Sequence, residues 1–64
     1  MSAALSSPAP EGVDLVGTFH RFGEAGPAYE VLSIAGEGQV RIMVLESGET
    51  LDYPVAEVRE DPRA

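Results

Sequence analysis

The chain has 64 residues, eleven acidic and four basic, for a formal net charge of −7, and it contains no cysteine. This length allows one small domain, and the missing cysteines exclude a disulfide and any metal site built on thiolates. The negative charge makes nucleic acid and anionic membranes poor partners, because both are bound by clusters of lysine and arginine. A basic protein surface is a better electrostatic match, although the charge also favours simple solubility.

The two ends of the chain differ in composition from the middle. Residues 1–12 are rich in proline and serine and have little to bury, so we expect a disordered N-terminal tail. Residues 61–64 are expected to fray, which leaves one domain at residues 13–60. No basic stretch precedes an apolar one at the N-terminus, and no apolar run reaches the ~20 residues of a membrane helix. The sequence therefore predicts a cytoplasmic protein.

Short segments rich in β-branched and aromatic residues alternate with turn signals along the domain. They predict four strands, at residues 15–22, 28–34, 39–46 and 49–53, with Ser47 and Gly48 forming a two-residue hairpin. One turn of 3₁₀-like helix at residues 54–58 would place Val55 and Val58 on the same side. A short fifth strand is expected at residues 58–60.

This order of elements resembles the SH3-like barrel, in which a long first loop, short hairpins and a late 3₁₀ turn separate five strands. We therefore predict an all-β fold, a small SH3-like barrel of about five antiparallel strands. The resemblance lies in the topology and covers residues 15–60. The paired tryptophan of the eukaryotic proline-binding SH3 domains has no counterpart, since the chain contains no tryptophan.

Two groups of motifs are also similar to a family of short, acidic, uncharacterised bacterial β-domain proteins. The first group is Gly17-Thr18-Phe19, Arg21-Phe22-Gly23 and Gly26-Pro27-Ala28-Tyr29-Glu30-Val31-Leu32. The second group is Glu46-Ser47-Gly48-Glu49 and Leu51-Asp52-Tyr53-Pro54. This resemblance implies a compact β domain and brings no established activity with it.

No residue pattern predicts catalysis or metal binding. The single histidine, His20, would need Ser33 or Ser47 as a nucleophile, and neither serine lies in a nucleophile-elbow motif. Phe19 and His20 alternate on a predicted strand, and Phe19 is the better core residue, so we expect His20 at the surface. The acidic residues lack the spacing of a calcium loop. We therefore predict a non-enzymatic protein with no cofactor and no metal site.

Two tyrosines are candidates for a peptide groove. Tyr29 and Tyr53 lie in places comparable to the groove aromatics of proline-binding SH3 domains, and Glu24 and Asp52 are near them in sequence. Together they predict a groove for a basic or proline-bearing peptide. In the alternative interpretation, both tyrosines close the barrel and their hydroxyls reach water or a carboxylate.

The alternation of side chains predicts a second surface. An antiparallel strand with one solvent face should alternate apolar and polar residues. In the predicted strands at residues 28–34 and 39–46, we expect Tyr29, Val31 and Ile42 to face the core. The side chains that alternate with them and face the opposite way are only partly polar. The surplus apolar residues would form one exposed patch on neighbouring strands: Leu32, Ile34, Met43 and Leu45. Alternatively, strong barrel curvature or the N-terminal residues cover this patch within the chain.

These observations predict a non-enzymatic protein-interaction module that binds itself or a protein partner through the apolar patch. An alternative is a regulator associated with nucleic acid, or an acidic antitoxin-like partner of a basic protein. Direct contact with nucleic acid would require all four arginines to cluster despite the net charge: Arg21, Arg41, Arg59 and Arg63. A third possibility is an accessory subunit that works beside an enzyme.

Overall fold

Four antiparallel strands form one open sheet in the computed structural model, which describes residues 10–64. The elements in chain order are η2 (Val13–Leu15), β1 (Phe19–Arg21), β2 (Ala28–Gly36), β3 (Gln39–Val44), β4 (Thr50–Pro54) and α1 (Val55–Glu60). The strands follow the spatial order β1-β2-β3-β4, and η2 is a single 3₁₀ turn. The prediction of an all-β domain is confirmed. Most of the expected tail, residues 1–9, lies outside the described residues.

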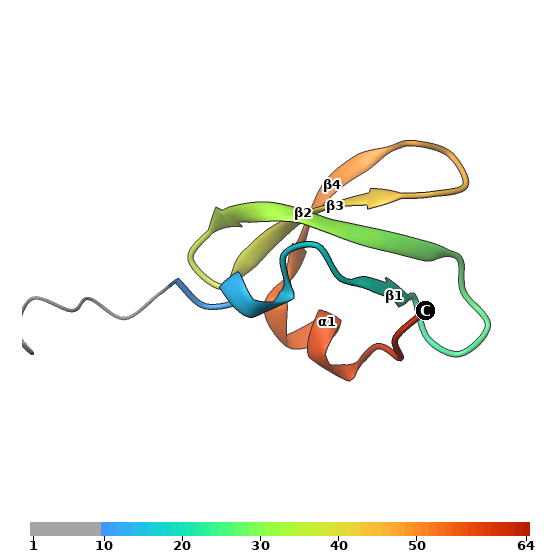
Figure 1. The fold of residues 1–64 in the computed structure, drawn as a ribbon, viewed down its shortest axis with the longest axis horizontal. Coiled ribbons are helices and arrows are strands. Elements are labelled where there is room, and N and C mark those ends of the chain that lie inside the picture. The colour runs from blue at the N-terminus through green and yellow to red at the C-terminus, as the bar shows by residue number, and fades with distance from the viewer. Residues whose placement is uncertain (1–9) are drawn as a thin grey trace, which may run out of the picture.

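The hairpin between β3 and β4 is longer than the sequence predicts. β3 ends at Val44 and β4 begins at Thr50, so five residues connect the strands where two were expected. Val44 N–H donates to Glu49 O (2.8 Å) and Gly48 N–H donates to Val44 O (2.7 Å), which closes the turn. Figure 1 shows this hairpin projecting from the body of the domain on the side away from α1.

The segment after β4 is an α-helix and not the expected 3₁₀ turn. α1 takes up residues 58–60, so the predicted fifth strand at those positions is wrong. Val55 and Val58 lie on the same side and are both buried, because residues three apart are also neighbours on an α-helix. Pro54 is the N-cap residue, where its missing N–H leaves no helical hydrogen bond unmade.

The C-terminal residues lie along β1, although the sequence predicts that they fray. Arg21 N–H donates to Pro62 O (2.9 Å), and Ala64 N–H donates to Phe19 O (3.0 Å). Between these two bonds His20 and Arg63 form an isolated antiparallel bridge. The last residues therefore pair with the edge of β1 that β2 leaves open, as Figure 1 shows by the position of the C-terminus beside β1.

The core lies between the sheet and the two helical segments. Figure 1 shows η2 and α1 on the same side of β2. Seven buried apolar residues from η2, β2, β3 and α1 make up this core: Leu15, Tyr29, Val31, Val40, Ile42, Val55 and Val58. The short helix and the 3₁₀ turn thus cover one side of the sheet, and no helical element of residues 10–64 covers the other.

Candidate interaction surface

The side of the sheet that faces away from the core carries apolar and charged residues together, and we call it the outer sheet face. Residues directly opposite each other in antiparallel strands project to the same side, so the strand register places the side chains in three rows. The first row is Arg21, Ala28 and Leu45, the second is Phe19, Glu30, Met43 and Thr50, and the third is Ser33, Arg41 and Asp52.

Three large apolar side chains lie in two of these rows. Phe19 and Leu45 are 42% and 44% exposed, and Met43 is half-buried. Met43 and Leu45 therefore lie on the side that the sequence predicts. The fold of residues 10–64 thus leaves a large part of the Phe19 and Leu45 side chains exposed.

A bulge in β2 changes the position of the other two predicted patch residues. Val31 is opposite Ile42 and Ser33 is opposite Arg41, so Leu32 is an extra residue between two regular pairs. The extra residue reverses the alternation: Ser33 is exposed, and Ile34 packs against the core. The structure thus corrects the predicted outward phase of Ile34, while Leu32 is half-buried at the bulge itself.

The positions of Phe19 and His20 are the reverse of the prediction. His20 is buried, with 3% of its surface exposed, and Phe19 is on the outer sheet face. The register explains this exchange, because His20 is opposite the buried Tyr29 and stacks on it with 5.8 Å between ring centroids. The alternation of side chains along the strand could not predict this exchange, because either Phe19 or His20 is able to occupy the inner position.

Of the four candidates for a peptide groove, the structure brings together only the two tyrosines, whose ring centroids are 5.5 Å apart. Tyr29 is fully buried and so leaves no surface for a peptide, and Tyr53 is half-buried. Glu24 is exposed in the loop after β1, while Asp52 forms an ion pair with Arg41 (2.8 Å) on the outer sheet face. This arrangement matches the alternative interpretation, in which the tyrosines close the domain.

Asp61 holds the two tyrosines. The Tyr29 hydroxyl donates to Asp61 Oδ2 at 2.6 Å, and the Tyr53 hydroxyl donates to the same oxygen at 3.2 Å. Gly23 N–H donates to the other carboxylate oxygen at 3.3 Å. Phe22 packs against both tyrosine rings, with its centroid 4.4 Å from that of Tyr29 and 5.3 Å from that of Tyr53, and the two tyrosine centroids are 5.5 Å apart. One carboxylate therefore satisfies the polar ends of an otherwise apolar aromatic cluster.

Burial and the Asp61 carboxylate both disfavour ionisation of these tyrosines. Desolvation, the larger cause, and the hydrogen bond to Asp61 raise the pKa of Tyr29. The same desolvation, together with the charge of Asp61 and its hydrogen bond, raises the pKa of Tyr53 to about 12. Both side chains are therefore neutral hydrogen-bond donors across the whole physiological pH range.

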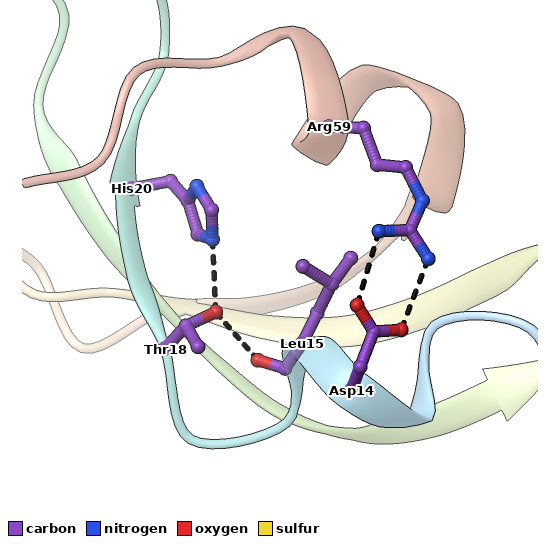
Figure 2. A network of polar contacts seen from close by, with 5 residues as sticks. All are labelled: Asp14, Leu15, Thr18, His20 and Arg59. Atoms are coloured by element: carbon purple, nitrogen blue, oxygen red, sulfur yellow. Dashed lines mark hydrogen bonds and ion pairs between the residues drawn. The ribbon is translucent and has the colours of Figure 1, made fainter.

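A second polar network joins the last turn of α1 to the N-terminal 3₁₀ turn (Figure 2). Arg59 makes two hydrogen bonds to Asp14, at 3.0 and 3.1 Å, in which each guanidinium nitrogen meets one carboxylate oxygen. The hydrogen bond from Arg59 lowers the pKa of the Asp14 carboxyl below its ordinary value. Because both side chains are exposed, this pair is a small tether and not part of the core.

His20 and Thr18 form a pair whose distance is typical of a base and its nucleophile, with 2.8 Å between Nε2 and Oγ1 (Figure 2). The Thr18 hydroxyl, however, donates its proton to Leu15 O at 2.5 Å. We therefore assign the His20 proton to Nε2, which makes the imidazole the donor to Thr18. In this arrangement His20 does not accept the hydroxyl proton, so the pair anchors η2 to β1.

The part of the chain at residues 10–64 contains no cluster of three or more potential metal ligands and no pocket for a small molecule. Two of the four arginines are held by carboxylates, Arg41 by Asp52 and Arg59 by Asp14. Within these residues no helix is both long enough and apolar enough to cross a membrane.

Two important residues were missed at the level of sequence. Phe19 was assigned to the core, and Asp61 to a solvated end of the chain. The only sequence signal for Asp61 is indirect: a buried tyrosine needs an acceptor for its hydroxyl, and that requirement does not say which acid supplies it. Phe19 carries no such signal, because its exposure depends on which residue faces Tyr29 across the sheet.

Comparison with known proteins identifies a family and no activity. Residues 4–64 match the model of a family of unknown function, DUF5397, and because the match covers nearly the whole chain, the protein belongs to that family. Neither a comparison with curated proteins nor one with solved structures gave a match. This membership supports the predicted relation to an uncharacterised family, and the family itself indicates no function.

Proposed function

We propose that this protein is a non-catalytic interaction domain that binds a protein through its outer sheet face. The observation that carries the proposal is the position of Phe19 and Leu45, both more than two-fifths exposed, on the side of the sheet opposite the core. Covering this apolar surface with another molecule stabilises the complex by about 25 cal/mol for each Å² removed from water.

We also propose that the fold is a small SH3-like barrel in which the C-terminal residues serve as the fifth strand. The pairing of Arg63 with His20 brings the end of the chain beside β1, and α1 occupies the place of the 3₁₀ turn before that last strand. Such barrels present sheet surfaces and loops to their partners, which agrees with a binding role.

The charge distribution favours a protein over nucleic acid as the partner. Binding to phosphates requires free lysine or arginine side chains, and of the four arginines Arg41 and Arg59 already face carboxylates within the chain. The net charge of −7 adds a repulsion against phosphates at long range.

A capture experiment with matched variants tests the proposed function. Phe19→Ser and Leu45→Ser remove apolar surface from the outer sheet face, and Leu51→Ser is the control. Leu51 is similarly exposed (40%), but it is opposite Ile42 and therefore lies on the other side of the sheet. Proteins captured from native extract should be lost with the first two variants and retained with the control. Equal capture by all three variants would contradict an interaction through this face.

A further inference from the structure

The outer sheet face is electrically neutral, although the chain as a whole is strongly acidic. Two of the four arginines, Arg21 and Arg41, and two of the eleven acids, Glu30 and Asp52, lie in its rows, so its formal charge is zero. The other nine acids and two arginines, which together carry the whole net charge of −7, lie elsewhere. Two copies of this chain therefore repel each other least when these faces meet.

The charges on this face are also arranged so that it complements itself. Arg41 and Asp52 neutralise each other within the chain. Arg21 and Glu30 lie in neighbouring rows, and within residues 10–64 neither has an ion-pair partner. The Arg21 guanidinium has one long contact, 3.5 Å to Gly26 O. A two-fold axis would place the free arginine of each copy opposite the free glutamate of the other, which is the pairing that an isologous interface requires.

We infer that the partner of the outer sheet face is a second copy of the same chain, an inference that rests on the proposed function. Phe19 and Leu45 supply the apolar part of the contact, and the reciprocal pairs of Arg21 with Glu30 lie among these apolar side chains. A standard interface covers about 800 Å² per partner, roughly a fifth of the 4133 Å² accessible surface of this chain. The strands of this sheet are short, three to nine residues, so we expect a small contact and a reversible dimer that depends on concentration.

Sedimentation equilibrium of the full chain, from about 1 μM to about 1 mM, tests this inference across the range of weak to moderate affinities. The weight-average mass should rise from the monomer value of 6.7 kDa towards twice that value. Phe19→Ser and Leu45→Ser should each weaken the association about tenfold, as loss of a central apolar contact does. The control Leu51→Ser should leave it unchanged. Circular dichroism verifies that every variant remains folded.

Charge reversal tests the reciprocal pairing separately. Arg21→Glu and Glu30→Arg should each weaken the dimer, because like charges then meet across the axis, and the double variant should restore it. A mass that stays at 6.7 kDa over the whole range, or a double variant that shows no recovery, overturns the second copy as partner. Capture of a different protein that depends on Phe19 would still support the proposed function, so the two failures are distinguishable.

Discussion

The hydroxyl of Tyr29 and the carboxylate of Asp61 are 2.6 Å apart, which joins the middle of the sheet to the residue just after α1. The Asp61 backbone ends the helix by donating to Glu57 O and Val58 O, while its side chain turns towards the aromatic cluster. Asp61 thus fixes where the helix stops and also satisfies a buried polar group, so its side chain is important for the stability of the fold.

Asp61→Ala should destabilise the protein by about 1–3 kcal/mol, because the buried Tyr29 hydroxyl loses its acceptor. The free energy of unfolding in urea measures the effect. Tyr29→Phe in the same background should recover part of the loss, since no buried hydroxyl then remains unpaired. Strictly additive effects of the two substitutions would contradict the proposed pairing.

Alkaline pH should unfold the protein through its two tyrosines. Their pKa values are raised in the folded state, that of Tyr53 to about 12, above the ordinary value of 10. A raised pKa of this kind contributes stability that is complete below pH 10 and is lost as the pH rises through the folded-state value. Ultraviolet spectra of tyrosinate and circular dichroism should therefore change together above pH 10. Ionisation of both tyrosines near pH 10 with the fold intact would contradict the burial of Tyr29.

Gly12→Ala should be more destabilising than Gly17→Ala. Both glycines have positive φ, 92° and 90°, so alanine costs about 1–2 kcal/mol at either position. A methyl group at Gly17 meets open space, whereas at Gly12 it lies 2.8 Å from Val55 Cγ2. Overpacking there adds about 1–3 kcal/mol. Denaturation in urea measures both, with Gly36→Ala, which has neither strain nor contact, as the control. Equal losses at the two sites would argue against the close packing of Gly12 on α1.

The ion pair between Arg59 and Asp14 should make a small contribution that disappears in acid. The pKa of Asp14 is lowered in the folded state, so its stabilisation is present above its ordinary value of 3.8 and is lost as the pH falls through the folded-state value. Asp14→Asn should therefore lower the melting temperature slightly at neutral pH and have no effect in strong acid. A difference from wild type that persists in acid would show that Asp14 acts through another contact.

The bulge at Leu32 makes opposite predictions for two residues that the sequence placed on one patch. Ile34 packs against the core, so Ile34→Ala should cost about 1–3 kcal/mol, less than at a fully buried site. Leu45 is 44% exposed, and Leu45→Ala should cost less than about 1 kcal/mol. Urea denaturation of the two variants measures the difference, and equally small losses at Ile34 and Leu45 would support the regular alternation without a bulge.

Regular features of the fold could be predicted from the sequence. β-branched residues and turn signals were enough for the four strands, and spacing was enough to place Val55 and Val58 together in the core. Met43 and Leu45 follow from the period of two along β3, because that strand has no bulge before Val44. These predictions succeed where a local rule acts without interruption.

The remaining features depend on pairings between distant residues. The extra residue at Leu32 is defined only by its partners on β3, and it moves Ile34 from one side of the sheet to the other. The exchange of Phe19 and His20 depends on the position of Tyr29 in the next strand. The C-terminal residues are ordered by their contact with β1. Composition contains none of this information, so the outer sheet face could be only partly predicted.

The central claim is that two copies of this acidic protein meet through the neutral outer sheet face. Amide NMR spectra recorded at increasing concentration of the full chain test it most directly. We predict that shifts which depend on concentration will cluster at Phe19, Glu30, Met43 and Leu45 and will be absent from α1. Spectra that do not change up to about 1 mM, or shifts that gather on α1 instead, would contradict it.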